Sequence, residues 1–72
     1  MNMPTQKQVS YMKNRYPVGT RVELVKMDDI QAPSVGTRGT VLYVDDLGDV
    51  GVNWDNGSCL AAVCGIDYIR RV

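Results

Sequence analysis

The chain contains no histidine, and this absence narrows the chemistry open to it. Histidine is the side chain that most often serves as a general acid or base near neutral pH, and it is the commonest metal ligand. Neither sign of charge is in excess, because eight Lys and Arg residues balance eight Asp and Glu residues. Nucleic-acid binders normally carry a basic excess, so nucleic acid is not an expected partner.

Cysteine and long apolar runs are also scarce. Two cysteines, Cys59 and Cys64, are too few for the disulfide framework of a small secreted domain. On one regular strand they would point to opposite faces, so a mutual disulfide would need a turn between them. We expect two structural thiols and no catalysis by Cys59, because no histidine is present to activate it. No apolar run reaches the roughly 18 residues of a membrane helix, so no membrane segment is expected.

The residues that are present fit one small folded domain. The chain has 72 residues, of which 44% are hydrophobic. A domain of this size buries only about 60% of the surface of its unfolded chain, so its core is marginal. We predict a binding protein rather than an enzyme, without a cofactor or a bound metal.

Residues 4–15 have the pattern of a short helix. Pro4 suits a first helical turn, where its missing N–H costs nothing. Alternatively, Thr5 and Gln8 form a capping box and the helix begins slightly later. The residue before a proline is disfavoured in the helical conformation, so the helix should end at Tyr16. The predicted domains are a helical arm, residues 1–16, and a β domain, residues 17–72.

Val9, Met12 and Tyr16 form an apolar stripe along this helix. A helix of about 12 residues with so few apolar contacts does not hold alone, so it must dock on the β domain or on another subunit. We predict a homo-oligomer with these three residues at the contact, because a marginal core also gains from a partner. A frayed, partly ordered arm is the alternative.

From Val18 onward, apolar and polar residues alternate with the period of β-strands. Residues 28–36 hold acid, proline, serine and glycine and predict a long loop, and Asn56-Gly57 is typical of a hairpin turn. Gly39 indicates a bulge or a sharp bend inside the second strand. The predicted strands are residues 20–27, 37–44, 50–54, 58–63 and 68–72.

Five short strands spaced by roughly ten residues indicate a small, strongly bent barrel. A long first loop, a meander and a short turn before the last strand is the order of SH3-like barrels. A five-stranded oligonucleotide-binding barrel is the rival, but it usually carries a helix where this chain has only residues 55–57. The prediction is a mainly β protein: a small five-stranded SH3-like barrel preceded by a short N-terminal α-helix.

Several linked motifs resemble one known family over about residues 16 to 71. The motifs are Tyr16-Pro17-x-Gly19-Thr20-Arg21-Val22-Glu23-Leu24, Met27-Asp28-Asp29, Ala32-Pro33, Gly36-Thr37-x-Gly39-Thr40-Val41, Val44-Asp45-Asp46, Val52-Asn53-Trp54-Asp55-Asn56-Gly57-Ser58 and Gly65-x-Asp67. They are similar to a family of tailed phages, prophages and Gram-positive bacteria that is catalogued as domain of unknown function 4314. The resemblance implies a phage or mobile-element origin and a place in the bacterial cytoplasm, and it carries no agreed activity.

Two aromatic residues are candidates for stacking on a planar ligand. The only tryptophan, Trp54, directly precedes the hairpin. On the inward face it would be the main core residue, because Val50 and Val52 share its parity. On the outward face, or at the barrel mouth, it would be a stacking platform. Tyr43 shares a face with Val41 in a regular strand and is the second candidate.

Polar residues complete the predicted site. Arg38 and Arg21 lie on strands and could bind phosphate or carboxylate through two hydrogen bonds, the alternative being a solvated face or a cross-strand pair with Glu23. Asp29 and Asn56 could bind sugar hydroxyls or base edges. The predicted ligand residues are Asp29, Arg38, Tyr43, Trp54 and Asn56.

Acidic residues gather in the predicted loops, at Asp28, Asp29, Asp45, Asp46 and Asp49. Paired carboxylates suggest acid–base chemistry or a hard cation. A calcium loop needs alternating ligands and a terminal glutamate, which this sequence lacks. We interpret these aspartates as turn residues, because Asp bonds readily to its own backbone.

Two functions fit these observations. The first is a phage sponge that sequesters a nucleotide-type host immune signal, a small anionic ligand, in a pocket formed between subunits. The second is an SH3-like interaction module that binds a protein or a nucleic acid. A fold alone does not choose between them.

Overall fold

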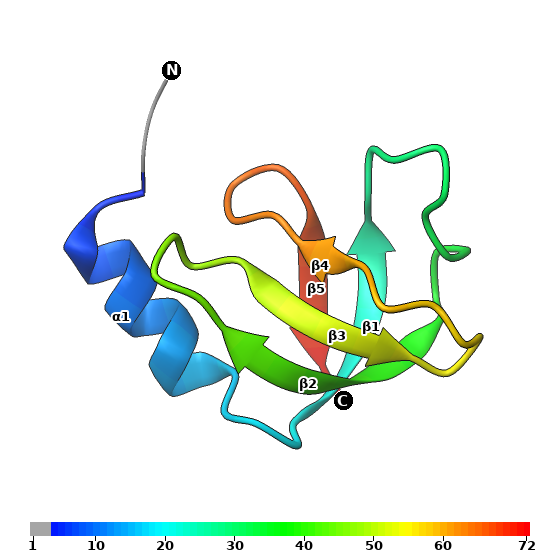
Figure 1. Cartoon of the computed structure of the whole chain (residues 1–72), viewed down its shortest axis with the longest axis horizontal. Coiled ribbons are helices and arrows are strands. Elements are labelled where there is room, and N and C mark those ends of the chain that lie inside the picture. Colours follow the sequence, from blue (N-terminus) through cyan, green and yellow to red (C-terminus); the bar gives the residue numbers. More distant parts are fainter. Residues whose placement is uncertain (1–3) are drawn as a thin grey trace.

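Residues 4–72 are described by a computed structural model, and they form one helix and five strands (Figure 1). The first three residues of the predicted arm lie outside the described residues. The elements are α1 (Gln6–Arg15), β1 (Arg21–Lys26), β2 (Arg38–Val44), β3 (Val50–Trp54), β4 (Ala61–Ala62) and β5 (Tyr68–Arg71).

The strands form one antiparallel sheet in the order β4-β3-β2-β1-β5. Within residues 4–72, β4 pairs only with β3 and β5 pairs only with β1, so the sheet is open between β4 and β5. The prediction of a mainly β protein with a short N-terminal helix is confirmed at this level. The sheet bends strongly, and register shifts interrupt both β1 and β2.

The bulge of β2 lies at a different residue from the predicted one. The register shifts between Val41 and Tyr43, not at Gly39. Gly39 is instead a place of close approach, because a Cβ there would lie 2.6 Å from Cγ1 of Val52 and 2.8 Å from the carbonyl oxygen of Asn53. The bulge changes the parity of the strand, so Val41 is buried while Tyr43 is 49% exposed. The prediction that these two residues share a face is wrong for this reason.

β4 is much shorter than the predicted strand of residues 58–63. The hairpin continues past the Asn-Gly pair, and the N–H of Trp54 donates to the carbonyl of Ser58. The carbonyl of Leu60 accepts the indole N–H of Trp54 at 2.9 Å instead of joining the sheet. The indole of Trp54, the last core residue of β3, therefore occupies a carbonyl group that a longer β4 would have used for strand pairing.

α1 begins with the capping box that Thr5 and Gln8 predicted. The backbone N–H of Gln8 donates to Oγ1 of Thr5, and the N–H of Thr5 donates to the side chain of Gln8. This cap places the first helical residue at Gln6, two residues after the start that Pro4 suggested. The N–H of Tyr16 donates to the carbonyl of Met12 and ends the helix before Pro17.

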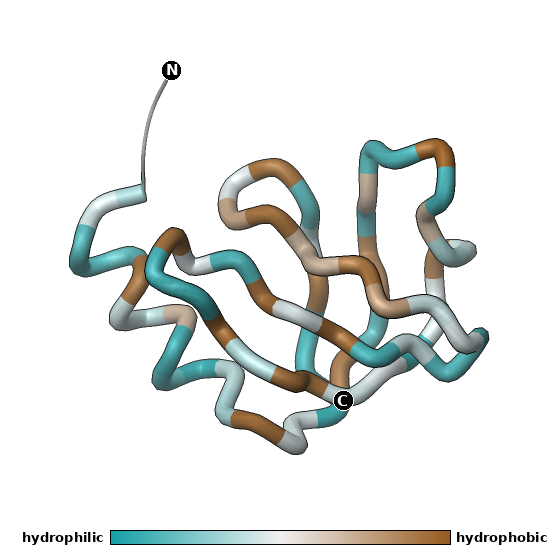
Figure 2. Tube along the Cα trace, viewed as in Figure 1, coloured by the Kyte–Doolittle hydropathy of each residue, from teal (hydrophilic) through white to brown (hydrophobic). Residues whose placement is uncertain are grey.

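The core lies on the inner, concave side of the sheet, and α1 packs against it (Figure 1). Hydrophobic stretches recur along the strands (Figure 2). Buried residues alternate with more exposed ones over the first four residues of both β1 and β2. The buried core side chains are Tyr16, Val22, Leu24, Val41, Val50, Val52, Trp54 and Ala62, with Met12, Met27, Val44, Leu60 and Ile69 packed partly buried around them.

The apolar stripe of α1 is covered by its own chain. Val9 is 4% exposed, Tyr16 is 7% exposed, and Met12 packs against the core. Nζ of Lys13 also pairs with the carboxylate of Asp46 at 2.9 Å, which joins α1 to the turn between β2 and β3. Within one chain the stripe thus docks on the β domain, which is one of the two arrangements that the sequence left open, and the homo-oligomer stays a prediction.

No helix among residues 4–72 is long and apolar enough to cross a membrane.

Candidate apolar groove at the open seam

A groove runs between α1 and the segment that joins β4 to β5. It consists of two adjoining hollows of about 170 and 380 Å³. Met12, Cys64 and Gly65 line both hollows, so the two lie side by side, and together we call them the seam groove. The smaller hollow is also lined by Ala62 of β4 and by Tyr68 and Ile69 of β5. The groove therefore lies where β4 and β5 are not paired.

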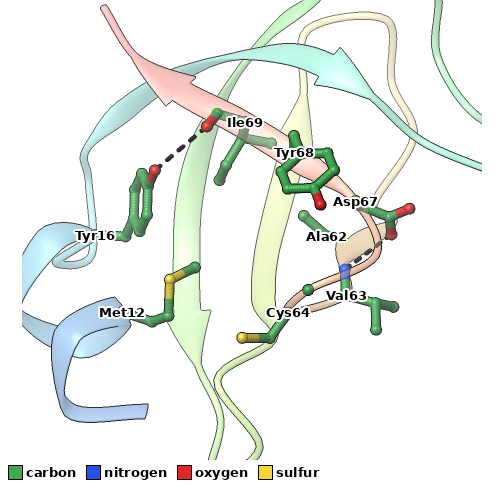
Figure 3. A pocket seen from close by; sticks show the side chains of 9 residues that line it. Met12, Tyr16, Ala62, Val63, Cys64, Asp67, Tyr68 and Ile69 are labelled. Carbon is green, nitrogen blue, oxygen red and sulfur yellow. Dashed lines mark hydrogen bonds between the residues drawn. The ribbon is translucent and has the colours of Figure 1, made fainter. Parts of the chain in front are cut away.

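Residues from both sides of the seam face the smaller hollow (Figure 3). Met12 projects from α1 and Tyr16 from the position directly after it, and Tyr68 and Cys64 project from the β4–β5 side. The hydroxyl of Tyr16 donates to the carbonyl of Ile69 at 3.4 Å, so α1 bridges to the free edge of β5. The helix thus forms one wall of the seam groove without closing it.

Asp67 gives the β4–β5 segment its shape. Its Oδ2 accepts the N–H of Val63 at 2.8 Å, and its Oδ1 accepts the N–H of Asp28 at 3.3 Å. The N–H of Cys64 donates to the carboxylate of Asp49 at 2.9 Å. Because these carboxylates bind backbone groups, the segment is held in one conformation beside the groove.

The rim of the groove exposes hydrophobic and aromatic side chains. Tyr68 is 52% exposed and Tyr11, which lines the larger hollow, is 60% exposed. Val63 and Ile66 of the β4–β5 segment are exposed as well, and this segment is hydrophobic over most of its length (Figure 2). Clustered exposed apolar groups of this kind mark interaction sites more often than scattered ones do.

The outer face of the sheet carries a separate, charged cluster. The guanidinium of Arg21 binds both carboxylate oxygens of Asp55, at 2.9 and 2.6 Å. Glu23 accepts from Arg38 at 3.3 Å and from two nitrogens of Arg70 at 3.0 and 2.8 Å. We call these five residues the arginine face.

The ion pairs of the arginine face favour its charged forms. Hydrogen bonds from Arg70, with further bonds from Arg38, lower the pKa of the Glu23 carboxyl below its ordinary value. The hydrogen bond from Arg21 lowers the pKa of Asp55 in the same way. The pairing of Arg38 with Glu23 is the cross-strand pair that was the alternative to ligand binding.

The structure does not assemble the five predicted ligand residues into one site. Trp54 is 1% exposed and lies in the core, so its ring offers no stacking face. The ring of Tyr43 covers Gly51, at the end of β2 nearer α1. Arg38 lies at the other end of β2, about 17 Å away for five residues of strand.

The two remaining predicted ligand residues lie in loops away from α1 (Figure 1). Oδ1 of Asp29 accepts the N–H of Gln31 at 2.8 Å. Oδ1 of Asn56 accepts from both the N–H and the hydroxyl of Ser58. Both side chains are used to shape their own turns.

The other loop aspartates behave mostly as turn residues. Oδ1 of Asp45 accepts the N–H groups of Leu47 and Asp49. Asp46 instead pairs with Lys13, and the hydrogen bond from Lys13 lowers its pKa. In the part of the chain that the structure describes, no three His, Cys, Asp or Glu side chains gather as a metal site.

Both cysteines are free thiols. Cys59 is exposed on the outer side, with its Sγ 3.7 Å from Oδ1 of Asn53, whereas Cys64 is half-buried in the groove. The seam groove was not predicted, although the sequence held one signal: Cys64 and Ile66 are apolar residues in the short turn predicted between the strands of residues 58–63 and 68–72. Apolar residues in a turn are exposed to water unless another part of the chain or a partner molecule packs against them.

The chain is similar to one known family over nearly its whole length. Residues 5–72 match the family described as Domain of unknown function (DUF4314). The chain belongs to this family. The match covers α1, all five strands and both walls of the seam groove, so the groove lies entirely inside the DUF4314 domain. No curated protein and no solved structure matches the chain.

Proposed function

We propose that the chain is a non-catalytic interaction module built on an SH3-like barrel that stays open between its fourth and fifth strands. The order β4-β3-β2-β1-β5, the long first loop and the short segment before β5 support this interpretation of the sheet. In this proposal α1 is an addition that covers part of the open seam.

The observation that carries the proposal is the seam groove. It combines a half-buried apolar floor with exposed tyrosines on its rim, an arrangement typical of surfaces that bind side chains of a partner protein. Tyrosine is among the residues that contribute most to such interfaces. The occupant in this proposal is a segment of polypeptide from another protein.

A sponge for a nucleotide-type immune signal is the second candidate. The residues expected to stack on a base do not support it, because Trp54 is buried and Tyr43 covers Gly51. One observation favours an anionic ligand: among the described residues, the guanidinium of Arg38 makes only its Nε bond, to Glu23. Its two terminal nitrogens remain for a phosphate or a carboxylate. Phage origin and action in the bacterial cytoplasm belong to this proposal too.

A peptide selection tests the proposed module. Random twelve-residue peptides displayed on phage are selected against the folded chain, and selected sequences are synthesised and titrated by calorimetry. We expect Tyr68→Ala to weaken their binding at least tenfold, because an exposed aromatic wall of the groove is lost.

Tyr43→Ala is the matched control, because Tyr43 is similarly exposed at 49% and does not line the groove. Circular dichroism establishes that both variants are folded. Equal affinity in wild type and Tyr68→Ala would contradict the proposal. Tight binding of a cyclic dinucleotide that Arg38→Ala abolishes would favour the sponge instead.

A further inference from the structure

Resting on the proposed function, we infer that the seam groove selects a polypeptide segment that carries acidic residues beside its apolar side chains. The inference follows from the charges around the groove, taken together with its apolar lining. It names the chemistry of the partner, which the proposed function leaves open.

The only carboxylate in the lining of the groove is Asp67. Both of its oxygens accept backbone N–H groups, from Val63 and Asp28. A basic partner residue would therefore meet a carboxylate whose oxygens are each already directed at one backbone N–H. Asp49 also lies close, because its carboxylate accepts the N–H of the lining residue Cys64, but neither it nor any other acid among the described residues joins Asp67 in the lining.

Two lysines near the groove, Lys7 and Lys26, form no ion pair with the residues that the structure describes. Lys7 lines the larger hollow. Lys26 lines neither hollow, but its Nζ lies 5.9 Å from the centre of the ring of Tyr68, which lines the smaller hollow. One lysine thus lines the larger hollow and another lies next to a residue of the smaller one, where both can meet an acidic segment.

The helix α1 adds further positive charge on its side of the groove. α1 carries Lys7, Lys13 and Arg15 and contains no acidic residue. Lys13 forms an ion pair with Asp46 in the turn between β2 and β3, so its charge is already balanced by a carboxylate. Lys7 is then the helix cation that both lines the groove and is open to a partner.

The dimensions of the groove limit the length of the segment. The part of its wall from Lys7 to Tyr16, the residue directly after α1, covers nine residue steps, or about 13 Å at 1.5 Å per step. An extended chain advances about 3.3 Å per residue, so about four residues span this wall. Such a segment places apolar side chains on Met12 and Tyr68 and acidic residues beyond them, near Lys7 and Lys26.

Two synthetic peptides test the inference on the full chain. Both are eight residues long, have blocked ends and share a central Trp-Leu-Leu-Trp core. One has two acidic residues on each side, Asp and Glu, and the other has two Lys on each side. We expect calorimetry at low salt to show at least tenfold tighter binding of the acidic peptide, and this preference should shrink at high salt.

A charge reversal locates the effect. Lys7→Glu should weaken the acidic peptide at least fivefold and strengthen the lysine peptide. Arg15→Glu is the matched control, because it makes the same change of charge on an exposed residue of α1 that does not line the groove. We expect Arg15→Glu to change either affinity less than twofold.

Three results with the peptides would contradict the inference. They are equal affinity for both peptides, no binding of either, and a preference that Arg15→Glu alters as much as Lys7→Glu. None of them decides the proposed function, which is tested separately by the effect of Tyr68→Ala on the binding of the selected peptides. A dimer in light scattering that Tyr68→Ala dissociates would identify a second copy of this chain as the occupant and would also overturn the inference.

Discussion

Single residues show how a local irregularity redirects a side chain. Strand periodicity correctly places Val22 and Leu24 inside, and Arg21 and Glu23 outside. The same rule fails for Tyr43, because the bulge after Val41 adds one residue to the strand and reverses the parity. Nothing in the side chains of this segment marks the bulge.

Gly51 explains where the ring of Tyr43 goes. A Cβ on Gly51 would collide with that ring, so the glycine makes room for a cross-strand tyrosine on the outer face. Gly39 has a different neighbour, the carbonyl oxygen of Asn53. One glycine is thus covered by a movable ring and the other by fixed backbone.

These two neighbours predict unequal substitutions. We expect Gly39→Ala to destabilise the protein by about 2–3 kcal/mol, because the backbone of β3 must shift. Gly51→Ala should cost less, about 1 kcal/mol, because the Tyr43 ring can rotate away. Urea denaturation of the two variants measures both values. A larger loss for Gly51→Ala than for Gly39→Ala would show that the Tyr43 ring is fixed.

At the scale of elements, α1 depends on its cap and on its docking. It has ten residues, which is too short for a stable isolated helix in water. The capping box was readable from Thr5 and Gln8 because it is a local sequence pattern. The docking partner was not readable, because a stripe of three apolar residues fits the same chain and another subunit equally well.

The cap predicts a measurable contribution. Thr5→Ala removes the acceptor for the N–H of Gln8 and should cost about 1 kcal/mol of stability. Thr5→Ser keeps the oxygen and should cost little. Thermal unfolding followed by circular dichroism compares the two. A Thr5→Ser variant as unstable as Thr5→Ala would show that the methyl group, not the cap, is what matters.

Docking within one chain predicts how Val9→Ala behaves. Val9 is buried by its own chain, so its truncation should cost about 1–2 kcal/mol for the lost apolar burial. This loss should be the same at low and high protein concentration, because no second subunit is released on unfolding. A denaturation midpoint that rises with concentration in the wild type and not in Val9→Ala would instead place Val9 at a subunit contact.

At the scale of the whole molecule, the sequence predicted the strands better than their assembly. The third strand was predicted with its observed ends, since Val50, Val52 and Trp54 alternate regularly and the Asn-Gly pair follows. The seam between β4 and β5 was not predicted, because it depends on Leu60 bonding to Trp54 and on pairing that does not form. A site built on unpaired strands has no local sequence pattern, and so the seam groove was found only in three dimensions.

The arginine face links three strands through charge, and this predicts how stability depends on pH. Glu23 of β1 binds Arg38 of β2 and Arg70 of β5, and its pKa is lowered in the folded chain. A carboxyl whose folded pKa is lowered contributes stability that is fully present above its unfolded pKa, about 4.3, and is lost as the pH falls through the folded value. The pKa values of Asp55 and Asp46 are lowered as well, so their contributions to stability are also lost as the pH falls.

We therefore expect the free energy of unfolding to be nearly constant from pH 7 to about pH 5 and to fall below about pH 4. Glu23→Gln should unfold more readily than the wild type at pH 7, and the difference should narrow by pH 3, where the wild-type carboxyl is becoming protonated. Added salt should reduce the difference at pH 7, because these pairs are exposed to solvent. Urea titrations at pH 7, 5 and 3 measure this. A gap between the two proteins that stays constant down to pH 3 would mean that Glu23 stabilises the sheet by packing rather than by its charge.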